Sequence, residues 1–315
     1  MSRLVPLVVL LFLAVPAAAG ETVKVFAWSL TPQSQAVIQG LERVWQRSLP
    51  IRSADGDPEK AVQVSRELAQ EKLPVLVVLG TPALIAAAPR LQRTQLVFAM
   101  VADPYQTGAA YDRSRPGDHQ ENVIGIASPP PLHEVLEKAR TLFPNRRHWG
   151  LIYNPWEGAS VELQQEFAAL AQQAGLTLTV RSADSPAAAN AAVQLMVAQG
   201  VEIFFLPPDH FSQTYAPTLL ALGKEQRLIV VNGNPRLEPR GAVLSVTLDY
   251  EAVGEEAGRL VQRLLAGERP KTIPIRQFSP ARVEVDETLL SRWAGYPVRQ
   301  EGKGTGDKGG KRRGQ

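Results

Sequence analysis

Short, nearly continuous apolar runs alternate along the chain with longer stretches in which apolar residues recur every three or four positions. The short runs predict β-strands at 22–28, 74–79, 95–101, 122–127, 148–153, 176–180, 201–206, 228–231 and 242–247. Strands so uniformly apolar are typical of a parallel sheet whose two faces are both covered by helices. Alternation of such strands with helical stretches predicts βαβ units and an α/β fold.

The helical stretches show the spacing of core-facing amphipathic helices. Leu132, Val135, Leu136 and Ala139 recur at i, i+3, i+4 and i+7, which places them on one helix face. The order of strands and helices runs once to residue 127 and again from residue 148 to 231. We therefore expect two open, Rossmann-like parallel-sheet lobes in series, although the halves share no detectable sequence repeat.

The segment after residue 247 is too short for a third lobe. It contains a predicted helix at 250–265, an extended stretch at 272–278 and a short helix near 288–293. The simplest interpretation returns the chain to the first lobe and then to the second, which gives three crossovers. We expect lobe 1 to contain residues 20–127 and 248–270, and lobe 2 to contain residues 128–247 and 271–297.

The two ends of the chain differ in composition from the middle. Arg3 precedes an apolar run from Leu4 to Val15, and small residues follow up to Gly20. This pattern predicts a cleavable signal peptide over residues 1–19, because spanning a bilayer needs about 20 apolar residues. An uncleaved anchor is the alternative. Residues 298–315 form a basic tail that is rich in Gly, Lys and Arg and is predicted to be disordered.

Composition excludes several kinds of chemistry. The 34 Lys and Arg residues exceed the 31 Asp and Glu residues by only three, and no helix gathers the basic residues, so we expect no nucleic-acid partner. With no Cys, the chain has no disulfide, thiol nucleophile or lipid attachment site. The four His residues lack metal-site spacing, and no motif for a cofactor, a serine hydrolase or a phosphate loop occurs outside the tail.

Candidate chemistry lies in the residues that directly follow the predicted strands. In open parallel sheets, ligands bind beside the carboxyl ends of the strands. The polar and aromatic residues at these positions, which we expect to bind a ligand, are Trp28, Ser29, Thr81, Asp103, Ser128, Asn154, Glu157, Asp209 and Asn232.

These residue types fit a zwitterion. Thr81 followed by Pro82 predicts an N-cap and a first helical residue, which would direct a positive helix end at a carboxylate. Asp103, Glu157 and Asp209 would accept hydrogen bonds from an ammonium group. The alternatives are an ordinary capped helix for Thr81 and turn or cap roles for the acidic residues. Trp28 and Trp156 offer aromatic faces to a ring or a cation, or pack within the lobes.

A series of short motifs carries a resemblance to a known family. The motifs are Val78-Leu79-Gly80-Thr81-Pro82-Ala83, Val97-Phe98-Ala99-Met100-Val101-Ala102-Asp103-Pro104, Asn122-Val123-Ile124-Gly125-Ile126, Leu151-Ile152-Tyr153-Asn154-Pro155, Pro207-Pro208-Asp209, and Asp249-Tyr250 with Gly254, Ala257 and Gly258. In this order and spacing the chain resembles ABC-transporter substrate-binding proteins of the tryptophan/tyrosine-binding type.

The resemblance implies the type I periplasmic binding protein fold, with a small molecule, such as an amino acid, held between two lobes. It also implies no catalysis, no cofactor, a monomer, and an inner-membrane ABC permease as partner. A periplasmic sensing module for a membrane kinase is an alternative, as is an α/β enzyme that uses Asp103, Glu157 or Asp209 as acid or base.

The chain departs from the family pattern in three places. Residues 112–121 form a longer insertion, Ile124 replaces a threonine, and Ala159 replaces the second asparagine of an Asn-Pro-x-Glu-x-Asn-Ser pattern. The two replacements predict the loss of two polar ligand contacts.

The mature protein should begin near Gly20 in the periplasm, because the small residues before it suit signal peptidase. The intact mass of the secreted protein measures this directly. Recovery of a membrane-bound species that retains residues 1–19 would contradict the expected localisation.

Overall fold

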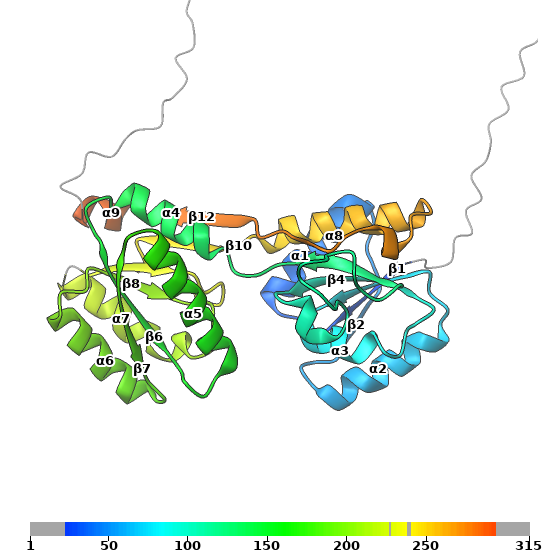
Figure 1. Cartoon of the computed structure of the whole chain (residues 1–315), viewed down its shortest axis with the longest axis horizontal. Helices are drawn as coiled ribbons and strands as arrows, with labels where there is room; N and C mark the ends of the chain where they lie inside the picture. Colours follow the sequence, from blue (N-terminus) through cyan, green and yellow to red (C-terminus); the bar gives the residue numbers. More distant parts are fainter. Residues whose placement is uncertain (1–22, 227, 238–240, 294–315) are drawn as a thin grey trace, which may run out of the picture. The chain divides into compact units, whose positions relative to one another are not determined.

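The computed structural model describes residues 23–226, 228–237 and 241–293. The expected signal peptide and the predicted disordered tail lie outside these residues. The chain divides into two compact units (Figure 1), which hold residues 23–129 with 250–278 and residues 130–249 with 279–293. The boundaries fall after residues 129, 249 and 278, where the sequence analysis placed them after 127, 247 and 270.

Unit 1 contains a six-stranded sheet in which every paired strand is parallel to its neighbour. The strand order is β2-β1-β3-β4-β5-β11. The strands are β1 (Val23–Ala27), β2 (Ile51–Ser53), β3 (Val75–Leu79), β4 (Gln95–Val101), β5 (Val123–Ala127) and β11 (Arg276–Gln277). All five residues of β3 are buried, as expected for a central strand with helices on both faces.

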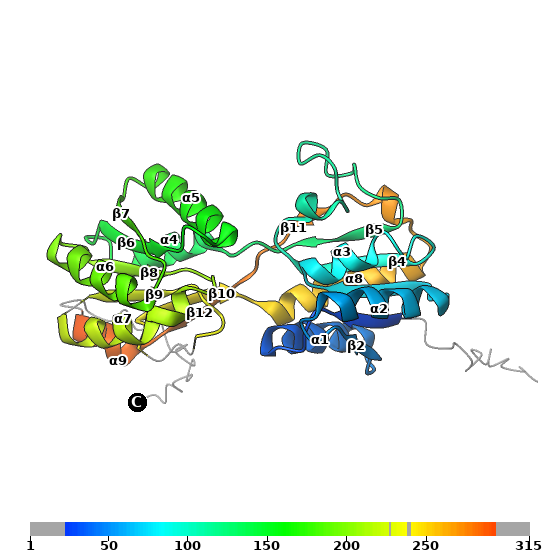
Figure 2. The ribbon, with the colours of Figure 1, turned by 90° about the horizontal axis from the view of Figure 1, so that it is seen from below.

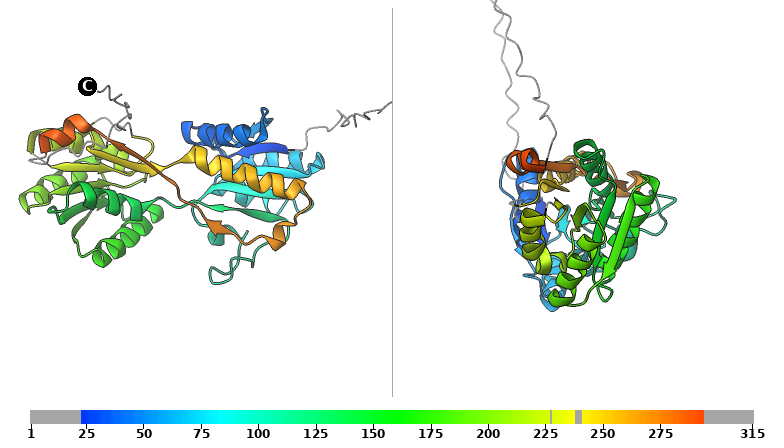
Figure 3. Two further views of the ribbon diagram at one scale, coloured as in Figure 1. Left: turned by 90° about the horizontal axis from the view of Figure 1, so that it is seen from above. Right: turned by 90° about the vertical axis from the view of Figure 1, so that its left-hand side faces the viewer.

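The helices of unit 1 are α1 (Pro32–Trp45), α2 (Pro58–Gln70), α3 (Thr81–Ala87) and α8 (Tyr250–Leu265), with 3-10 turns η1 (Pro104–Thr107) and η2 (Pro270–Thr272). Helix α8 packs against α1 and against strands β3, β4 and β5 (Figure 3). Helix α2 packs against α3. A segment from the far end of the sequence therefore completes the core of the first unit.

Unit 2 repeats this plan. Its strand order is β7-β6-β8-β9-β10-β12, with β12 antiparallel to β10 and the other pairs parallel. The strands are β6 (His148–Tyr153), β7 (Thr177–Ser182), β8 (Ile203–Leu206), β9 (Ile229–Asn232), β10 (Leu244–Leu248) and β12 (Ala281–Val285). The helices are α4 (Leu132–Leu142), α5 (Gly158–Gln173), α6 (Pro186–Ala198), α7 (Ser212–Gln226) and α9 (Glu287–Trp293).

Alternate residues of the unit 2 strands enter two separate cores. Phe204 and Leu206 of β8 join the cluster that includes the buried residues of α6 and α7. Ile203 and Phe205 join the cluster that includes those of α4 and α5. Phe205 stacks on Phe167 of α5 with the ring centroids 4.4 Å apart. This alternation explains why the strands read as continuous apolar runs in the sequence.

The predicted elements differ from the structure in three strands. The extended stretch 272–278 was assigned to lobe 2, but it supplies β11, which pairs with β5 of unit 1 through Arg276 opposite Ile126. The sequence analysis missed β2 and β12, whose residues are mostly exposed or half-buried and therefore form no apolar run. Within the described residues, no helix is long and apolar enough to cross a membrane.

Helices α1 and α8 cross at glycines. A Cβ atom on Gly254 would lie 2.0 Å from the carbonyl oxygen of Val37, and one on Gly40 would lie 2.1 Å from that of Glu251. Real Cβ atoms do not approach backbone so closely, so a larger residue at either position must push the helices apart.

Gly254→Ala should therefore lower the free energy of unfolding by about 1–3 kcal/mol, the usual cost of overpacking a close contact. Urea unfolding followed by circular dichroism measures the change. Gly158→Ala is the matched control, because Gly158 also lies in a helix but a Cβ there meets nothing within 4 Å. Equal stability of the two variants would show that the crossing tolerates a side chain.

Candidate ligand-binding site

The carboxyl ends of the unit 1 strands lie side by side at one edge of the sheet. Backbone hydrogen bonds continue past the strands, from Trp28 N to Leu79 O (2.9 Å), Gly80 N to Ala99 O (3.0 Å) and Ser128 N to Val101 O (2.9 Å). Trp28, Ser29 and Thr81 are half-buried, and Ser128 is buried. The predicted site residues of this unit are thus brought to one edge, as parallel strand direction requires.

Thr81 does not have the predicted capping role. The N-cap of α3 is Gly80, whose φ of 98° favours glycine, and Thr81 is the first helical residue. No side chain caps the helix, and α3 contains only seven residues. The expected carboxylate site at the start of this helix therefore lacks the capping hydroxyl of Thr81.

Asp103 uses its carboxylate within the chain. One oxygen accepts a hydrogen bond from Tyr105 N at 3.0 Å, which caps η1. The other oxygen forms an ion pair with Arg113, a residue of the insertion. Asp103 was predicted to accept a ligand ammonium, but the structure gives that position to the Arg113 guanidinium.

The corresponding edge of unit 2 holds a buried carboxylate. Asp209, which follows β8, is only 6% exposed. Its two oxygens accept hydrogen bonds from Ser160 Oγ at 2.6 Å and from Ser212 N at 2.7 Å. Because Ser160 lies in the first turn of α5 and Ser212 begins α7, Asp209 fixes the starts of both helices relative to the sheet.

Two asparagines after β9 extend this buried network. Asn234 Nδ2 donates to Asp209 O at 2.7 Å and to Ser212 Oγ at 2.8 Å. Asn232 accepts from Asn234 N at 2.9 Å and donates to Ser245 Oγ of β10 at 3.0 Å. The predicted residues Asp209 and Asn232 therefore belong to one network. The predicted site did not include the other members, Ser160, Ser212, Asn234 and Ser245, because nothing in their local sequence marks them as partners.

Asn154 and Glu157 form a more accessible layer beside this network. Asn154 Nδ2 donates to Glu157 Oε1 at 3.1 Å, and Asn154 N donates to Ser160 Oγ at 3.0 Å. Trp156 N donates to Asn154 Oδ1 at 3.0 Å, while the Trp156 side chain is 82% exposed. The turn after β6 thus fixes a half-buried carboxylate next to an exposed indole.

The two carboxylates make this edge negative. Burial raises the pKa of Asp209 above its ordinary range, although the hydrogen bonds from Ser160 and Ser212 oppose this effect. The nearby charge of Glu157 raises the same pKa further. Within the part of the chain that the structure describes, no basic side chain forms an ion pair with either carboxylate. The arrangement can therefore attract and bind a cationic group.

The two residues that replace polar residues of the family pattern differ in burial. Ile124 is fully buried inside β5, so the missing threonine hydroxyl is a change in the core and not at the sheet edge. Ala159 is exposed in the first turn of α5, close in sequence to Glu157. Of the two polar contacts that we expected to be lost, only the one at Ala159 lies beside the candidate site.

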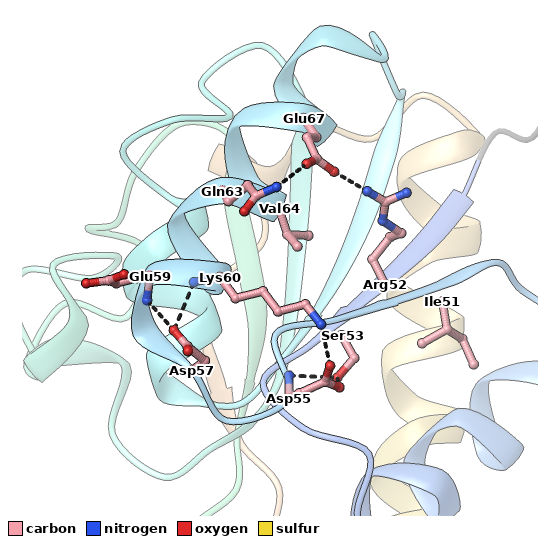
Figure 4. A pocket seen from close by; sticks show the side chains of 10 residues that line it. All are labelled: Ile51, Arg52, Ser53, Asp55, Asp57, Glu59, Lys60, Gln63, Val64 and Glu67. Carbon is pink, nitrogen blue, oxygen red and sulfur yellow. Dashed lines mark hydrogen bonds and ion pairs between the residues drawn. The ribbon is translucent and has the colours of Figure 1, made fainter.

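A hollow of about 640 Å³ in unit 1 lies away from the predicted site residues (Figure 4). It is bounded by β2 and α2, and it contains two ion pairs, Arg52 with Glu67 and Lys60 with Asp55. No group of three or more His, Asp or Glu residues in the described ranges could hold a metal ion. The residues at the two sheet edges remain the candidate site.

The buried Asp209 should make stability depend on pH. Because its folded-state pKa is raised, its favourable contribution is fully present below the ordinary value of 3.8 and is lost as the pH rises through the folded-state pKa. The stability of Asp209→Asn relative to wild type should therefore rise as the pH increases from about 3.8. Urea titrations across this range measure the difference, with exposed Asp184→Asn as the control. A difference in stability between Asp209→Asn and wild type that does not change with pH would contradict the raised pKa of Asp209.

Comparisons with known proteins place this geometry in a family. The family model described as "ABC transporter substrate binding protein" matches residues 35–292. A tyrosine-binding protein of Clostridioides difficile is 21% identical over 242 residues, which cover 77% of this chain and 69% of that protein.

Solved structures agree on the fold. A ligand-free, open substrate-binding protein with adhesive properties from Clostridium difficile has a TM-score of 0.80 at 18% identity, covering 89% of this chain and 97% of that one. An ABC domain in complex with L-Trp from Streptococcus pneumonia has a TM-score of 0.65 at 22% identity, covering 86% and 93%. The two lobes are those of the type I periplasmic binding protein fold. Because the family match spans most of the chain, this protein belongs to the substrate-binding proteins of ABC transporters.

Proposed function

We propose that this protein captures a small molecule, an amino acid, in the periplasm, as a monomer, and delivers it to an ABC importer in the inner membrane. The observation that carries the amino-acid part of the proposal is the negative edge of unit 2, where two carboxylates lie without a basic partner among the described side chains. Family membership supports the transport role. An ammonium group is the simplest cation that such a pair of carboxylates would select.

Glu157 is the better candidate to touch the ammonium group. Its carboxylate is half-buried, and the contact with Asn154 Nδ2 leaves the second oxygen without a hydrogen bond in the structure. Asp209 is more deeply buried, and both of its oxygens already accept hydrogen bonds from Ser160 and Ser212. We propose that Asp209 acts indirectly. It adds negative charge near Glu157, and it fixes the starts of the helices that position Glu157.

The aromatic residues at the sheet edges support a ligand with a flat or cationic surface. Trp156 is exposed beside Glu157, and an indole face attracts both aromatic rings and ammonium groups. Trp28 occupies the carboxyl end of β1 in unit 1. The two relatives that bind tyrosine and L-Trp make these amino acids the first ligands to test.

Unit 1 supplies neutral polar groups to the proposed site. Ser29, Thr81 and Ser128 follow strands β1, β3 and β5 of its sheet, where hydroxyl groups can hydrogen-bond a polar ligand. Asn154 and Asn232 supply amide groups at the edge of unit 2. We propose that these side chains are available to hydrogen-bond polar groups of the ligand.

Glu157→Gln should weaken the binding of L-tyrosine or L-tryptophan by about 10- to 100-fold. The substitution keeps the shape of the side chain and removes one charge-assisted hydrogen bond, worth about 1.5–3 kcal/mol. Isothermal titration calorimetry measures the affinity of both variants after removal of any bound compound.

Glu162→Gln is the matched control, because it removes the same charge from the exposed surface of the same helix. It should leave the affinity unchanged. Equal affinities of wild type, Glu157→Gln and Glu162→Gln would show that the unit 2 edge does not bind the ammonium group. A wild-type protein that binds no amino acid would overturn the proposed ligand class.

A further inference from the structure

The insertion after η1 is an ordered loop of unit 1. Tyr111 N donates to Asp118 O, and Gln120 N donates to Ala109 O, each at 2.9 Å, so the two arms of the loop pair with each other. At its base, His119 is buried and its two ring nitrogens lie 2.9 Å from the carbonyl oxygens of Gln120 and Ile273. The base of the loop is therefore fixed to the segment that leads into β11 (Figure 2).

The tip of the loop is organised around Asp112. Its carboxylate accepts hydrogen bonds from Ser114 N and Ser114 Oγ, at 2.9 and 2.7 Å, and from Arg115 Nε at 2.8 Å. The hydrogen bonds from Ser114 and Arg115 lower the pKa of Asp112 to about 2. Arg115 also pairs with Asp118 at 3.1 Å. The guanidinium of Arg115 is therefore ion-paired within the loop itself, with Asp112 and Asp118.

Arg113 lies two residues before Arg115, and its side chain extends from the loop to the carboxyl edge of the sheet. Its guanidinium forms an ion pair with Asp103, which follows β4, and lies 5.4 Å from the ring centroid of Tyr105. Contact with an aromatic face and a carboxylate restricts the plane of a guanidinium. The side chain of Arg113 is nevertheless 69% exposed, whereas that of Asp103 is 21% exposed.

A guanidinium has five N–H donors, and the structure uses one Nη2 donor of Arg113 for Asp103. The other donors of the Arg113 guanidinium are exposed to solvent at the carboxyl edge of the sheet, while Asp103 and Tyr105 hold the group in place. We propose that Arg113 binds the carboxylate of the ligand, and so replaces the start of α3 as the anionic subsite of unit 1. The planar, fork-like guanidinium matches a carboxylate through two parallel hydrogen bonds.

This inference rests on the proposed function, and it gives the two units complementary charges. Unit 1 presents Arg113 to a carboxylate, while unit 2 presents Glu157 to an ammonium group. An amino acid offers a carboxylate to Arg113, whereas the corresponding amine or amide does not. The insertion would thus make the protein select amino acids over the corresponding amines and amides.

The test compares L-tryptophan with L-tryptophanamide, which keeps the ring and the ammonium group and lacks the carboxylate, and L-tyrosine with L-tyrosinamide. Calorimetry should show that Arg113→Gln weakens binding of the amino acid by about 10- to 100-fold and leaves binding of the amide unchanged. Arg113→Lys should give an intermediate loss, because it keeps the charge and loses the paired geometry.

Arg115→Gln is the matched control, since Arg115 has the same 69% exposure and lies in the same loop, but its ion pairs are with Asp112 and Asp118. It should leave both affinities unchanged. If Arg113→Gln leaves binding of the amino acid unchanged, or weakens amino acid and amide equally, the carboxylate subsite is wrong while the proposed function stands. If wild type binds neither amino acid, the proposed ligand class fails, and the subsite fails with it.

Discussion

Parallel strand direction is the constraint on which the rest of the structure depends. In each unit, parallel strands end at one edge of the sheet, so every loop that follows one of these strands delivers its residues to the same place. The central strands β3 and β8 are buried on both faces and carry only apolar side chains. Polar chemistry is therefore confined to the edge. Asp103 in unit 1 and Asp209 in unit 2 both lie at such edges, although they are far apart in sequence.

The carboxyl edges of the two sheets hold their charged side chains in place by different physical means. In unit 2, burial and the side chains of Ser160, Ser212 and Asn234 hold Asp209 in place, and the cost of burying its charge appears as a raised pKa. In unit 1, the charge of Arg113 is carried to the edge by an insertion, and its guanidinium stays exposed while Asp103 and Tyr105 orient it. Unit 2 thus carries a buried anion, and unit 1 carries an exposed cation.

Sequence reasoning predicted the fold well because buried strands and helices show as apolar runs and as helical spacing of apolar residues in the sequence. Strands β4 and β6 and helix α8 have the predicted boundaries, since each contains an uninterrupted apolar run or a clear helical spacing. The edge strands β2 and β12 gave no such signal. The candidate site was predicted as individual residues after strands, but not as a network. Ser160 and Asp209 are 49 positions apart, and the pairing of Arg113 with Asp103 depends on how the insertion folds back.

The most direct test of the central account is the identity of the compound that the native protein carries. Mass spectrometry of small molecules released by denaturing the purified, secreted protein should find an unmodified compound with both an ammonium and a carboxylate group. Such a compound matches the negative edge of unit 2 and the guanidinium of unit 1. A released ligand with no basic nitrogen, such as a neutral sugar, would contradict the account, because Glu157 and Asp209 would then lie without a cationic partner.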